Sequence, residues 1–288
     1  MAKKSTRYLL LVILIVAVFI ILLVLLKGRQ ESPAPTERTQ AEREVENPAA
    51  KDKSGAGETT VAFDYLPRSV NQQIIRHQYI TLSYVEKHEQ AEWVAYELTG
   101  REVQGIEERT DDFREDPMVK TGSATLEDYY RSGYDRGHLA PAGDMKFSEE
   151  AMSESFFMSN MSPQLPEFNR GIWRLLEEQV REWALENGKL FVVTGPVFNQ
   201  RSRRIGDNKV SIPKAYYKVL LDYTEPEIKA IGFLLPNEGS DKDIFTFAVP
   251  IDSIEKVTQI DFFPALPEQE EVLLESEVEV SLWIGASY

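Results

Sequence analysis

The sequence predicts an α+β protein in which a mixed or mainly antiparallel central sheet is flanked by helices. Segments 77–85 and 92–98 are rich in aromatic and β-branched residues and are separated by a short polar stretch, which favours an antiparallel hairpin. Segment 169–187 carries apolar residues at helical spacing and is followed by Gly188, which is typical of an amphipathic helix and its end. A later strand-like segment at 228–235 runs into a turn, so we expect strands on both sides of the helix.

Residues 1–29 predict a membrane anchor. Residues 8–26 are uncharged and almost wholly aliphatic, and a helix of this length, rising about 1.5 Å per residue, crosses about 30 Å of hydrocarbon. A secretory signal peptide is the alternative, since basic residues precede the apolar run, but the run is long and no small-residue cleavage motif occurs before its end. Basic residues nearly balance across the span, and we expect the N-terminus inside and the bulk of the chain on the extracytoplasmic side.

Residues 30–60 predict a flexible linker. They are rich in Glu, Pro, Ala, Lys, Ser and Gly, and they hold too few large apolar side chains to offset the entropy of ordering. The remaining residues, 61–288, are interpreted as one folded domain. Its tail from Pro267 is expected to form a short acidic helix and a terminal apolar strand.

The charge and the cysteine content narrow the functions open to this domain. Residues 1–29 hold five of the 32 Lys and Arg and no Asp or Glu, so the rest of the chain carries 27 basic and 47 acidic side chains, a net charge of −20. Such an acidic body argues against binding nucleic acid through a broad basic surface, and any nucleic acid has to be held locally. The absence of cysteine excludes disulfides, thiolate metal sites and a cysteine nucleophile.

One stretch carries the pattern of a catalytic site. Residues 134–141 read Tyr-Asp-Arg-Gly-His-Leu-Ala-Pro, so His138 follows Arg136 by one glycine at the end of a β-like run. A neutral imidazole can take a proton from an attacking water at physiological pH, while a neighbouring guanidinium holds a phosphate group. His138 is therefore the candidate general base. His77 and His88, on or near the predicted hairpin, have no cluster of acids or histidines near them and are expected to be ordinary surface or strand residues.

The predicted helix at 169–187 turns two polar groups toward the same place. Its apolar residues lie within about 60° of one direction; Asn169 points along that stripe and Glu177 lies at its edge. Both could face a site between the helix and His138. An amide oxygen suits a hard divalent cation, so Asn169 is a candidate metal ligand, with a helix N-cap as the alternative. Glu177 and Arg181 are four residues apart, so a plain surface ion pair is the alternative to a functional role there.

Several ordered motifs follow one another after the predicted linker. They are Asp-Arg-Gly-His within 134–141, Met-Ser-Asn-Met-Ser-Pro-Gln at 158–164, Asn-Arg-Gly-Ile-Trp at 169–173, Val-Thr-Gly-Pro-Val at 193–197 and Ile-Pro-Lys-Ala-Tyr-Tyr-Lys at 212–218. Together they resemble the DNA/RNA non-specific endonucleases, an endonuclease G-like family of the ββα-metal (His-Me finger) superfamily. The resemblance fades near Phe263 and implies a ββα-metal unit at about 133–187 on one face of the sheet.

The resemblance also implies roles for the residues of the site. The matching asparagine, Asn169 here, is the sole or principal direct protein ligand of a largely hydrated Mg²⁺, with Mn²⁺ as an alternative, and the glutamate matching Glu177 holds the waters of the metal. Asp135 is expected to lie next to the groups that bind the metal and to support them without binding the metal directly. The phosphate-contacting arginines of the family correspond to Arg109, Arg136 and Arg181. The catalytic residues are then His138, Arg136, Glu177 and Arg109, although Arg109 lies in a loop whose spacing varies within the family.

The resemblance therefore implies a membrane-tethered, metal-dependent endonuclease that cuts DNA and RNA with little sequence preference and leaves 5′-phosphates. Such tolerance is expected where a protein grips phosphate and metal rather than base edges. Two alternatives remain open: a binding module for nucleic acid or protein that kept the fold and lost turnover, and a phosphodiesterase for small diesters. Asn160 either orients the site or stabilises a turn. The sequence sets no oligomeric state.

Overall fold

The computed structural model describes residues 63–70, 73–199 and 201–284. The predicted membrane anchor at 8–26 and the predicted linker at 30–60 lie outside the described residues. Among the helices that are described, none combines the length and the apolar character needed to cross a membrane.

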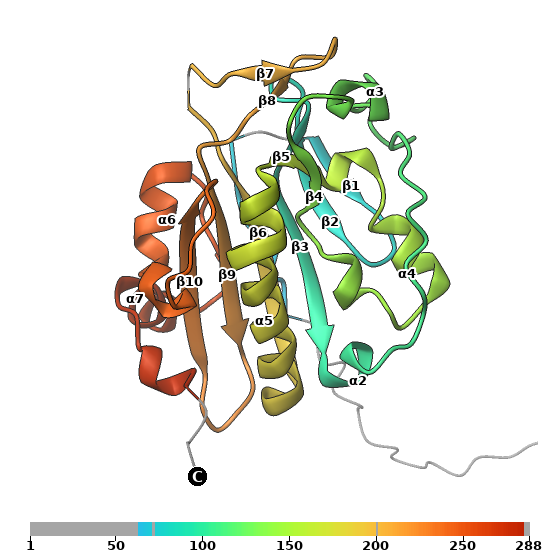
Figure 1. The fold of residues 1–288 in the computed structure, drawn as a ribbon. Helices are drawn as coiled ribbons and strands as arrows, with labels where there is room; N and C mark the ends of the chain where they lie inside the picture. The colour runs from blue at the N-terminus through green and yellow to red at the C-terminus, as the bar shows by residue number, and fades with distance from the viewer. Residues whose placement is uncertain (1–62, 71–72, 200, 285–288) are drawn as a thin grey trace, which may run out of the picture. The chain divides into compact units, whose positions relative to one another are not determined.

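A seven-stranded sheet forms the centre of the described domain (Figure 1). All of its neighbouring strands pair antiparallel, which confirms the mainly antiparallel sheet that the sequence predicted. The predicted hairpin is present, although its first strand begins at Thr81, so His77 precedes that strand. In spatial order the strands are β1 (Gln73–Arg76), β2 (Thr81–Val85), β3 (Gln90–Thr99), β6 (Lys189–Val197), β9 (Ala215–Asp222), β10 (Lys229–Pro236) and β11 (Ala248–Val249).

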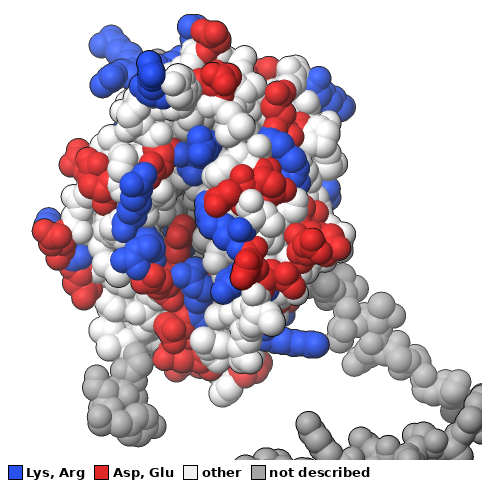
Figure 2. Space-filling model, turned by 45° about the vertical axis from the view of Figure 1, so that its right-hand side comes forward, with Lys and Arg blue, Asp and Glu red and all other residues white. Residues whose placement is uncertain are grey.

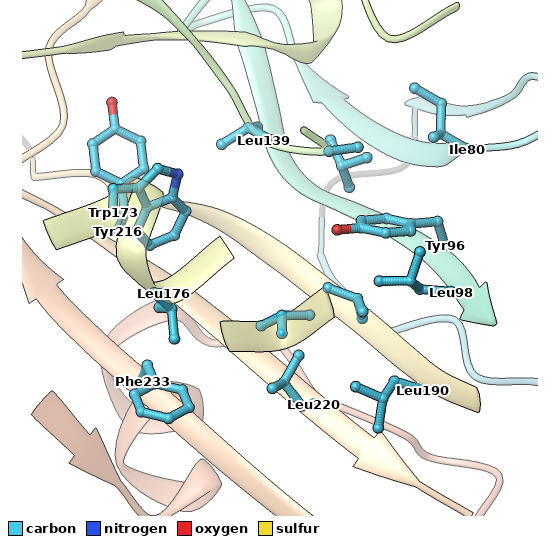
Figure 3. Close-up of a cluster of buried hydrophobic side chains, with 14 of the residues drawn as sticks. Ile80, Tyr96, Leu98, Leu139, Trp173, Leu176, Leu190, Tyr216, Leu220 and Phe233 are labelled. Atoms are coloured by element: carbon cyan, nitrogen blue, oxygen red, sulfur yellow. The ribbon is translucent and has the colours of Figure 1, made fainter. Parts of the chain in front are cut away.

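Both faces of this sheet are buried. Successive side chains of a strand point to opposite faces, so one strand contributes residues to both cores. In β3, Tyr96 and Leu98 belong to a first core on one face, which also holds Phe233 (Figure 3). Trp93 and Ala95, from the same strand, belong to a second core on the other face. The alternation along β3 thus decides which layer of helices each residue meets.

Helices cover the two cores. On the first core, α5 (Arg174–Asn187) buries Leu176, Val180, Trp183 and Ala184. On the second core lie α6 (Ile251–Thr258) and α7 (Glu268–Ser276), the acidic helix that the sequence predicted. Full burial of one large apolar side chain stabilises a fold by about 1.5–3 kcal/mol, so these stripes hold the helices in place. The terminal strand predicted after α7 is wrong for the described part of the tail, where a 3₁₀ turn, η5 (Val280–Leu282), occurs instead.

A separate two-stranded ribbon carries the motif at 134–141. Its strands β4 (Asp135–His138) and β5 (Met161–Gln164) pair antiparallel. The chain between them forms η1 (Ala142–Asp144), α4 (Glu149–Glu154) and η2 (Met158–Asn160). The other short elements are α2 (Gly100–Val103), α3 (Leu126–Tyr129), β7 (Arg204–Ile205), β8 (Val210–Ser211) and η4 (Ile244–Phe247).

The helix predicted at 169–187 is not continuous. It begins as a π-helical turn, η3 (Phe168–Trp173), and Gly171 breaks this turn with φ −104° and ψ −115° before α5 begins. The predicted end is correct, since Gly188 follows α5 with φ 84°, a conformation that glycine adopts without the clash of a Cβ atom. The break sets the direction of Asn169 separately from the axis of α5.

Candidate active site

The ribbon and the start of the helix bring predicted residues together. β4 carries Asp135, Arg136 and His138. The Asn169 side chain reaches across from η3 and donates from Nδ2 to Oδ2 of Asp135 at 2.9 Å. Because Asp135 holds the amide nitrogen, the amide oxygen points away from Asp135. Asn169 is the N-cap of neither η3 nor α5, so the capping interpretation is wrong.

Asp135 is fixed by a second partner, Arg170, which belongs to the motif at 169–173 but was given no role in the sequence prediction. Arg170 donates from Nη2 to Oδ1 of Asp135 at 2.7 Å and from Nε to Oδ2 at 2.8 Å, a two-pronged ion pair that suits the planar guanidinium. Partial burial disfavours ionisation of Asp135, but the hydrogen bonds from Arg170 and Asn169 outweigh it and lower the pKa of this carboxyl. Asp135 is therefore a carboxylate that orients Asn169. The signal for Arg170 was its position next to Asn169.

His138 is buried at the end of β4, with 8% of the residue exposed. Its ring packs edge-on against Phe156 and Phe113, at 4.9 and 5.8 Å between ring centroids. Its Nε2 atom is buried and has no hydrogen-bond partner among the described residues. Burial first, and then the positive charges of Arg109 and Arg136, lower the pKa of His138 to about 3. The imidazole is thus neutral at physiological pH, the state that a general base requires.

Two predicted arginines stack on the same aromatic rings that contact the candidate base. The guanidinium of Arg136 lies 4.4 Å from the centre of the Phe113 ring, and its buried Nε has no hydrogen-bond partner in the described part of the chain. The guanidinium of Arg109 lies 4.7 Å from the centre of the Phe156 ring, and its Nε donates to Asp111 at 2.6 Å. Stacking fixes each guanidinium plane and leaves N–H groups for an anion.

A cavity adjoins one of these two arginines, Arg109. This cavity, of about 540 Å³, is lined by residues that include Arg109, Gly143 and Lys146. A methyl group added at Gly143 would lie 2.9 Å from Nη1 of Arg181, so the third predicted arginine adjoins the wall of this cavity. Figure 2 shows a hollow in the face turned forward, with Lys and Arg side chains along its edges and Asp and Glu beside them. These Lys and Arg side chains give the edge of the hollow local positive charge, although the chain as a whole has a net charge of −15.

Arg181 is held by a buried carboxylate. It donates from Nη1 to Oδ1 of Asp144 at 2.8 Å, and the hydroxyl of Tyr96 donates to Oδ2 of the same group at 2.7 Å. Asp144 and Tyr96 are both fully buried. The described ion pairs include none between Glu177 and Arg181, so the simple pair at four-residue spacing is wrong. Asp144 lies in η1, and nothing in the local pattern predicted its role.

Glu177 shares this buried region with a lysine that the site prediction missed. Burial raises the pKa of Glu177, and the charge of Lys218 on β9 opposes that rise. Lys218 is fully buried; its Nζ lies 4.9 Å from the centre of the Trp173 ring and has no hydrogen-bond partner among the described residues. Burial likewise lowers the pKa of Lys218, against the attraction of Glu177. The only sequence signal for Lys218 was its place in the motif at 212–218.

Asn160 fixes the backbone that follows the candidate base. Its Oδ1 accepts from the amide of Ala140 at 2.9 Å, and its Nδ2 donates to the carbonyl oxygens of Ala140 and Ser155 at 2.9 and 2.8 Å. These three bonds occupy a fully buried amide. Of the two interpretations of Asn160, they favour the structural one, with the chain just after His138 as the part that it holds.

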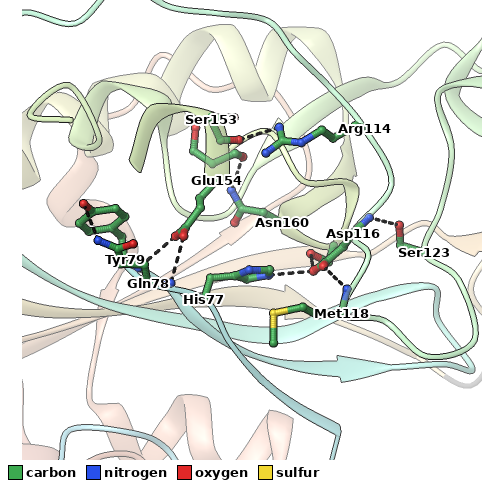
Figure 4. Close-up of polar contacts among 12 residues, drawn as sticks. His77, Gln78, Tyr79, Arg114, Asp116, Met118, Ser123, Ser153, Glu154 and Asn160 are labelled. Carbon is green, nitrogen blue, oxygen red and sulfur yellow. Dashed lines mark hydrogen bonds and ion pairs between the residues drawn. The ribbon is translucent and has the colours of Figure 1, made fainter. Parts of the chain in front are cut away.

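The expectation that His77 is an ordinary surface or strand residue is wrong. Its Nε2 lies 2.9 Å from Oδ2 of Asp116, and the two side chains are 5% and 0% exposed (Figure 4). Its ring stacks on Phe157 at 4.7 Å, and Ser159 donates to the same Asp116 oxygen at 2.6 Å. The pair thereby braces the segment before β5 that also packs on the candidate base. His88 is half-buried in the turn between β2 and β3.

The groups around Asn169 fit a hydrated divalent cation. The Asn169 amide offers a hard oxygen, and Asp135 holds that amide by its nitrogen. Glu177, on α5, offers a further carboxylate, and the charge of Lys218 favours its ionised form. One amide oxygen supported by nearby carboxylates suits Mg²⁺, because this ion keeps several of its waters when it binds to proteins.

The chain is similar to known nucleases over most of the described domain. A family model described as DNA/RNA non-specific endonuclease matches residues 59–269. The chain is 36% identical over 206 residues to the mitochondrial nuclease EXOG of Danio rerio, and this match covers 66% of the chain and 60% of that protein. It is 35% identical over 204 residues to the mitochondrial endonuclease G of Homo sapiens, covering 66% of the chain and 68% of that protein.

The fold is similar to a solved structure as well. The crystal structure of the EndoG/EndoGI complex contains a chain that superposes with a TM-score of 0.65 at 30% sequence identity. The superposition covers 68% of this chain and 88% of that chain. The family match, at residues 59–269, includes the ribbon and the helix that carry the candidate site.

Proposed function

Since this chain belongs to the DNA/RNA non-specific endonuclease family, we propose that it is a metal-dependent endonuclease that hydrolyses phosphodiester bonds of DNA and RNA with little sequence preference. The observation that carries the proposal is the state of His138. It is buried and neutral, its Nε2 has no partner among the described residues, and two arginines stack on the rings around it. These features together suit a base beside a phosphate.

His138 is the proposed general base. A water that attacks phosphorus has to lose a proton, and Nε2 of a neutral imidazole can accept it. Phe113 and Phe156 hold the ring edge-on and limit its motion, which keeps Nε2 in one direction. The backbone after His138 is fixed by Asn160 through the two bonds to Ala140. Positioning of this kind is a large part of what an enzyme contributes to a hydrolysis.

Asn169 is the proposed ligand of a divalent cation, Mg²⁺ or Mn²⁺, with Glu177 and Asp135 supporting it. Such an ion, when bound, supplies positive charge next to the phosphoryl oxygens and the leaving 3′ oxygen. Asp135 orients the Asn169 amide, and Arg170 keeps Asp135 ionised for that task. Glu177 is available to hold ordered water, because Lys218 opposes the effect of burial on its pKa.

The proposed grip on nucleic acid lies in Arg109, Arg136 and Arg181. Their guanidinium groups can each hold two oxygens of one phosphate, and phosphates carry no sequence information. Arg181 is oriented by Asp144, whereas Arg109 and Arg136 are oriented by aromatic rings. Little sequence preference follows, because the groups in these positions contact the backbone of a nucleic acid rather than the edges of its bases.

We also propose that residues 8–26 tether the protein to a membrane, with the catalytic domain on the extracytoplasmic side. The support is the uncharged apolar run and the acidic, linker-borne domain that follows it. A nuclease facing the cytoplasm without regulation would threaten the genome of its own cell, which favours the outward orientation.

The test is digestion of supercoiled plasmid and of single-stranded RNA by the purified protein, with Mg²⁺ or with EDTA. We expect the wild type to degrade both polymers with Mg²⁺ and neither with EDTA. His138→Ala should slow both reactions by about 10²–10⁴-fold, the range that a positioned base contributes. His88→Ala is the matched control, because the His88 side chain, in the β2–β3 turn, contacts Ser211 and Phe198 rather than the aromatic rings around the candidate base, and this variant should digest both substrates at the wild-type rate.

Intact polymers with the wild type and Mg²⁺ would contradict the proposal. Retained binding of the same polymers would then favour the binding-module alternative, whereas turnover of small diesters would favour the phosphodiesterase alternative. Equal loss of activity in the His138 and His88 variants would contradict the assignment of the base alone.

A further inference from the structure

Three carboxylates meet between α6 and α7, which cover the second core rather than the face with α5 (Figure 1). Asp252 and Glu255 are three residues apart on α6, and Glu275 comes from α7. One carboxylate oxygen from each of the three lies within 4.8 Å of the others. The two helices thus bring three carboxylates to one point. Three negative charges so close together repel one another unless a positive charge lies between them.

Glu275 shows that this point is more than an exposed acidic surface. It is 3% exposed, and its Oε1 is buried with no hydrogen-bond partner among the described residues. Burial first, and then the charges of Glu255 and Glu271, raise the pKa of Glu275 to about 9. Arg68 offsets part of the acidic field at Glu271. A buried, unpartnered carboxyl oxygen among carboxylates is a position that either a proton or a cation has to occupy.

The donors favour Ca²⁺ over Mg²⁺. Ca²⁺ takes about six to eight oxygens in a flexible arrangement at about 2.3–2.6 Å, whereas Mg²⁺ requires a near-ideal octahedron at about 2.0–2.1 Å, so carboxylates carried by two separate helices suit Ca²⁺ better. Oxygens that all lie within 4.8 Å of one another are close enough to contact one Ca²⁺ together. We propose that Asp252, Glu255 and Glu275 bind a Ca²⁺ ion that ties α7 to α6.

The three side chains are held in place and can be reached from solvent, as a cation site requires. Glu255 is held in place, because its Oε1 accepts from the backbone amide of Phe262 at 2.7 Å. Asp252 is exposed and gives an ion a route from solvent, while Glu275 forms the buried wall. The family match ends at residue 269, so Glu275 lies outside it. The site is independent of the proposed nuclease activity, and its test does not depend on turnover.

The experiment measures Ca²⁺ binding and thermal unfolding of the full-length protein, purified in a nonionic detergent. All proteins carry Asn169→Ala, which removes the ligand proposed for the catalytic cation. We expect this parent to bind one Ca²⁺ by calorimetry, and its Tm to rise by about 5 °C or more at a Ca²⁺ concentration a hundredfold above Kd. An equal concentration of Mg²⁺ should raise it less. Glu275→Gln and Asp252→Asn should each abolish the binding heat and the Tm shift.

Glu268→Gln is the matched control, because this exposed carboxylate lies on α7 outside the group of three, and it should respond to Ca²⁺ like the parent. A parent whose Tm does not respond to Ca²⁺, together with a Glu275→Gln variant that is more stable in EDTA, would mean that a proton occupies Glu275 and would overturn the proposal. An Asp252→Asn variant with an unchanged Ca²⁺ response would also overturn it. Asp252 is exposed, so that variant decides the matter even where Glu275→Gln fails to fold.

Discussion

At His138, burial decides the protonation state before any substrate binds. Its pKa of about 3 lies far below the ordinary imidazole value of 6.5, through burial first and then through Arg109 and Arg136. Between these two pH values the unfolded chain binds a proton that the folded protein does not. The contribution of His138 to stability is thus fully present above pH 6.5 and is lost as the pH falls through this window. The base itself stays deprotonated throughout that window.

The pH dependence of cleavage should reflect this. We expect the acid limb of kcat/KM for DNA to lie well below pH 6.5 in the wild type, because the neutral form of His138 persists there. Arg109→Gln removes one positive charge near the ring, so the pKa of His138 should rise and the acid limb should move up by about half a pH unit to one unit. The measurement is kcat/KM against pH from about 4 to about 8 for both proteins.

Arg101→Gln is the control for that shift, since Arg101 is an exposed arginine of α2. Its acid limb should coincide with that of the wild type, at the same salt concentration. A wild-type limb near pH 6.5, or an unmoved limb in Arg109→Gln, would show that burial and charge do not set the protonation of the base.

Lys218 allows a second prediction at the level of one residue. Its buried Nζ has no hydrogen-bond partner among the described residues, and its charge opposes the raised pKa of Glu177. In Lys218→Met, Glu177 should take up a proton at neutral pH, and the Mg²⁺ concentration for half-maximal cleavage should rise by about 10-fold or more. Raising the pH to about 9 should recover much of the loss. Tm should stay equal or rise, because the variant no longer buries an ammonium group without a hydrogen bond, and Glu177, once protonated, leaves no buried charge without its counter-charge.

Lys120→Met, on an exposed lysine, is the matched control and should leave both the Mg²⁺ requirement and Tm unchanged. If Lys218→Met lowers Tm by several degrees and leaves the Mg²⁺ requirement unchanged, Lys218 serves packing alone.

The sequence predicted those site residues that lie within a motif or that have their partners close along the chain. His138, Arg136 and Asn169 could be named because one short motif and the first turn of one helix contain them. Asp144 could not, because its partners Tyr96 and Arg181 lie 48 and 37 residues away on other elements. A contact of that kind arises from the packing of the sheet against α5, and periodicity within a segment carries no record of it.

The β4–β5 ribbon depends on a glycine beside the candidate base. A Cβ atom at Gly137 would lie 2.1 Å from Oε1 of Gln164, whose buried amide atoms have no hydrogen-bond partner among the described residues. Gly137→Ala should therefore push Gln164 aside and destabilise the protein by about 1–3 kcal/mol, which lowers Tm by about 3–10 °C. Because His138 is the next residue, cleavage should fall as well. Thermal unfolding and plasmid digestion measure the two effects.

The double variant Gly137→Ala/Gln164→Ala is the control for this mechanism. Shortening Gln164 removes the atoms that the new methyl group meets, so the double variant should regain at least half of the lost Tm. A double variant less stable than either single variant would mean that the strain at Gly137 arises from the backbone rather than from Gln164.

At the level of elements, local patterns predicted the hairpin β2–β3 and the helix α5 but not the break before that helix. Apolar residues recur at helical spacing through Gly171, so the pattern alone continues across it. The break occurs at Gly171, a residue with wide backbone freedom, and Asn169, two residues earlier, is hydrogen-bonded to Asp135 of the ribbon. Residues 174–187 of the predicted helix are regular α-helix, and the metal-ligand candidate lies in the irregular turn before them.

For the whole molecule, the α+β class followed from the sequence, whereas the order of strands did not. β3 lies between β2 and β6, and its pairing of Tyr96 with Val192 joins residues far apart in the chain. Alternation of side chains predicts that both faces of β3 are apolar, but it does not predict which strand pairs with the free side of β3 in the β2–β3 hairpin. That choice places α5 over the first core and so sets Glu177 and Arg181 opposite the loop that carries Asp144.

The last prediction concerns how the domain is held in the cell. Both cores and the candidate site lie within residues 63–284, so a protein truncated to residues 61–288 should fold and digest plasmid like the full chain. The full chain should sediment with membranes, whereas the truncated chain should remain in the supernatant, because residues 8–26 alone carry an uncharged run long enough to span hydrocarbon. External protease added to intact cells should remove the domain of the full chain and spare a cytoplasmic marker. If the protease cuts the domain only after the cells are lysed, the proposed orientation is wrong. If the full chain stays in the supernatant, the proposed membrane tether is wrong.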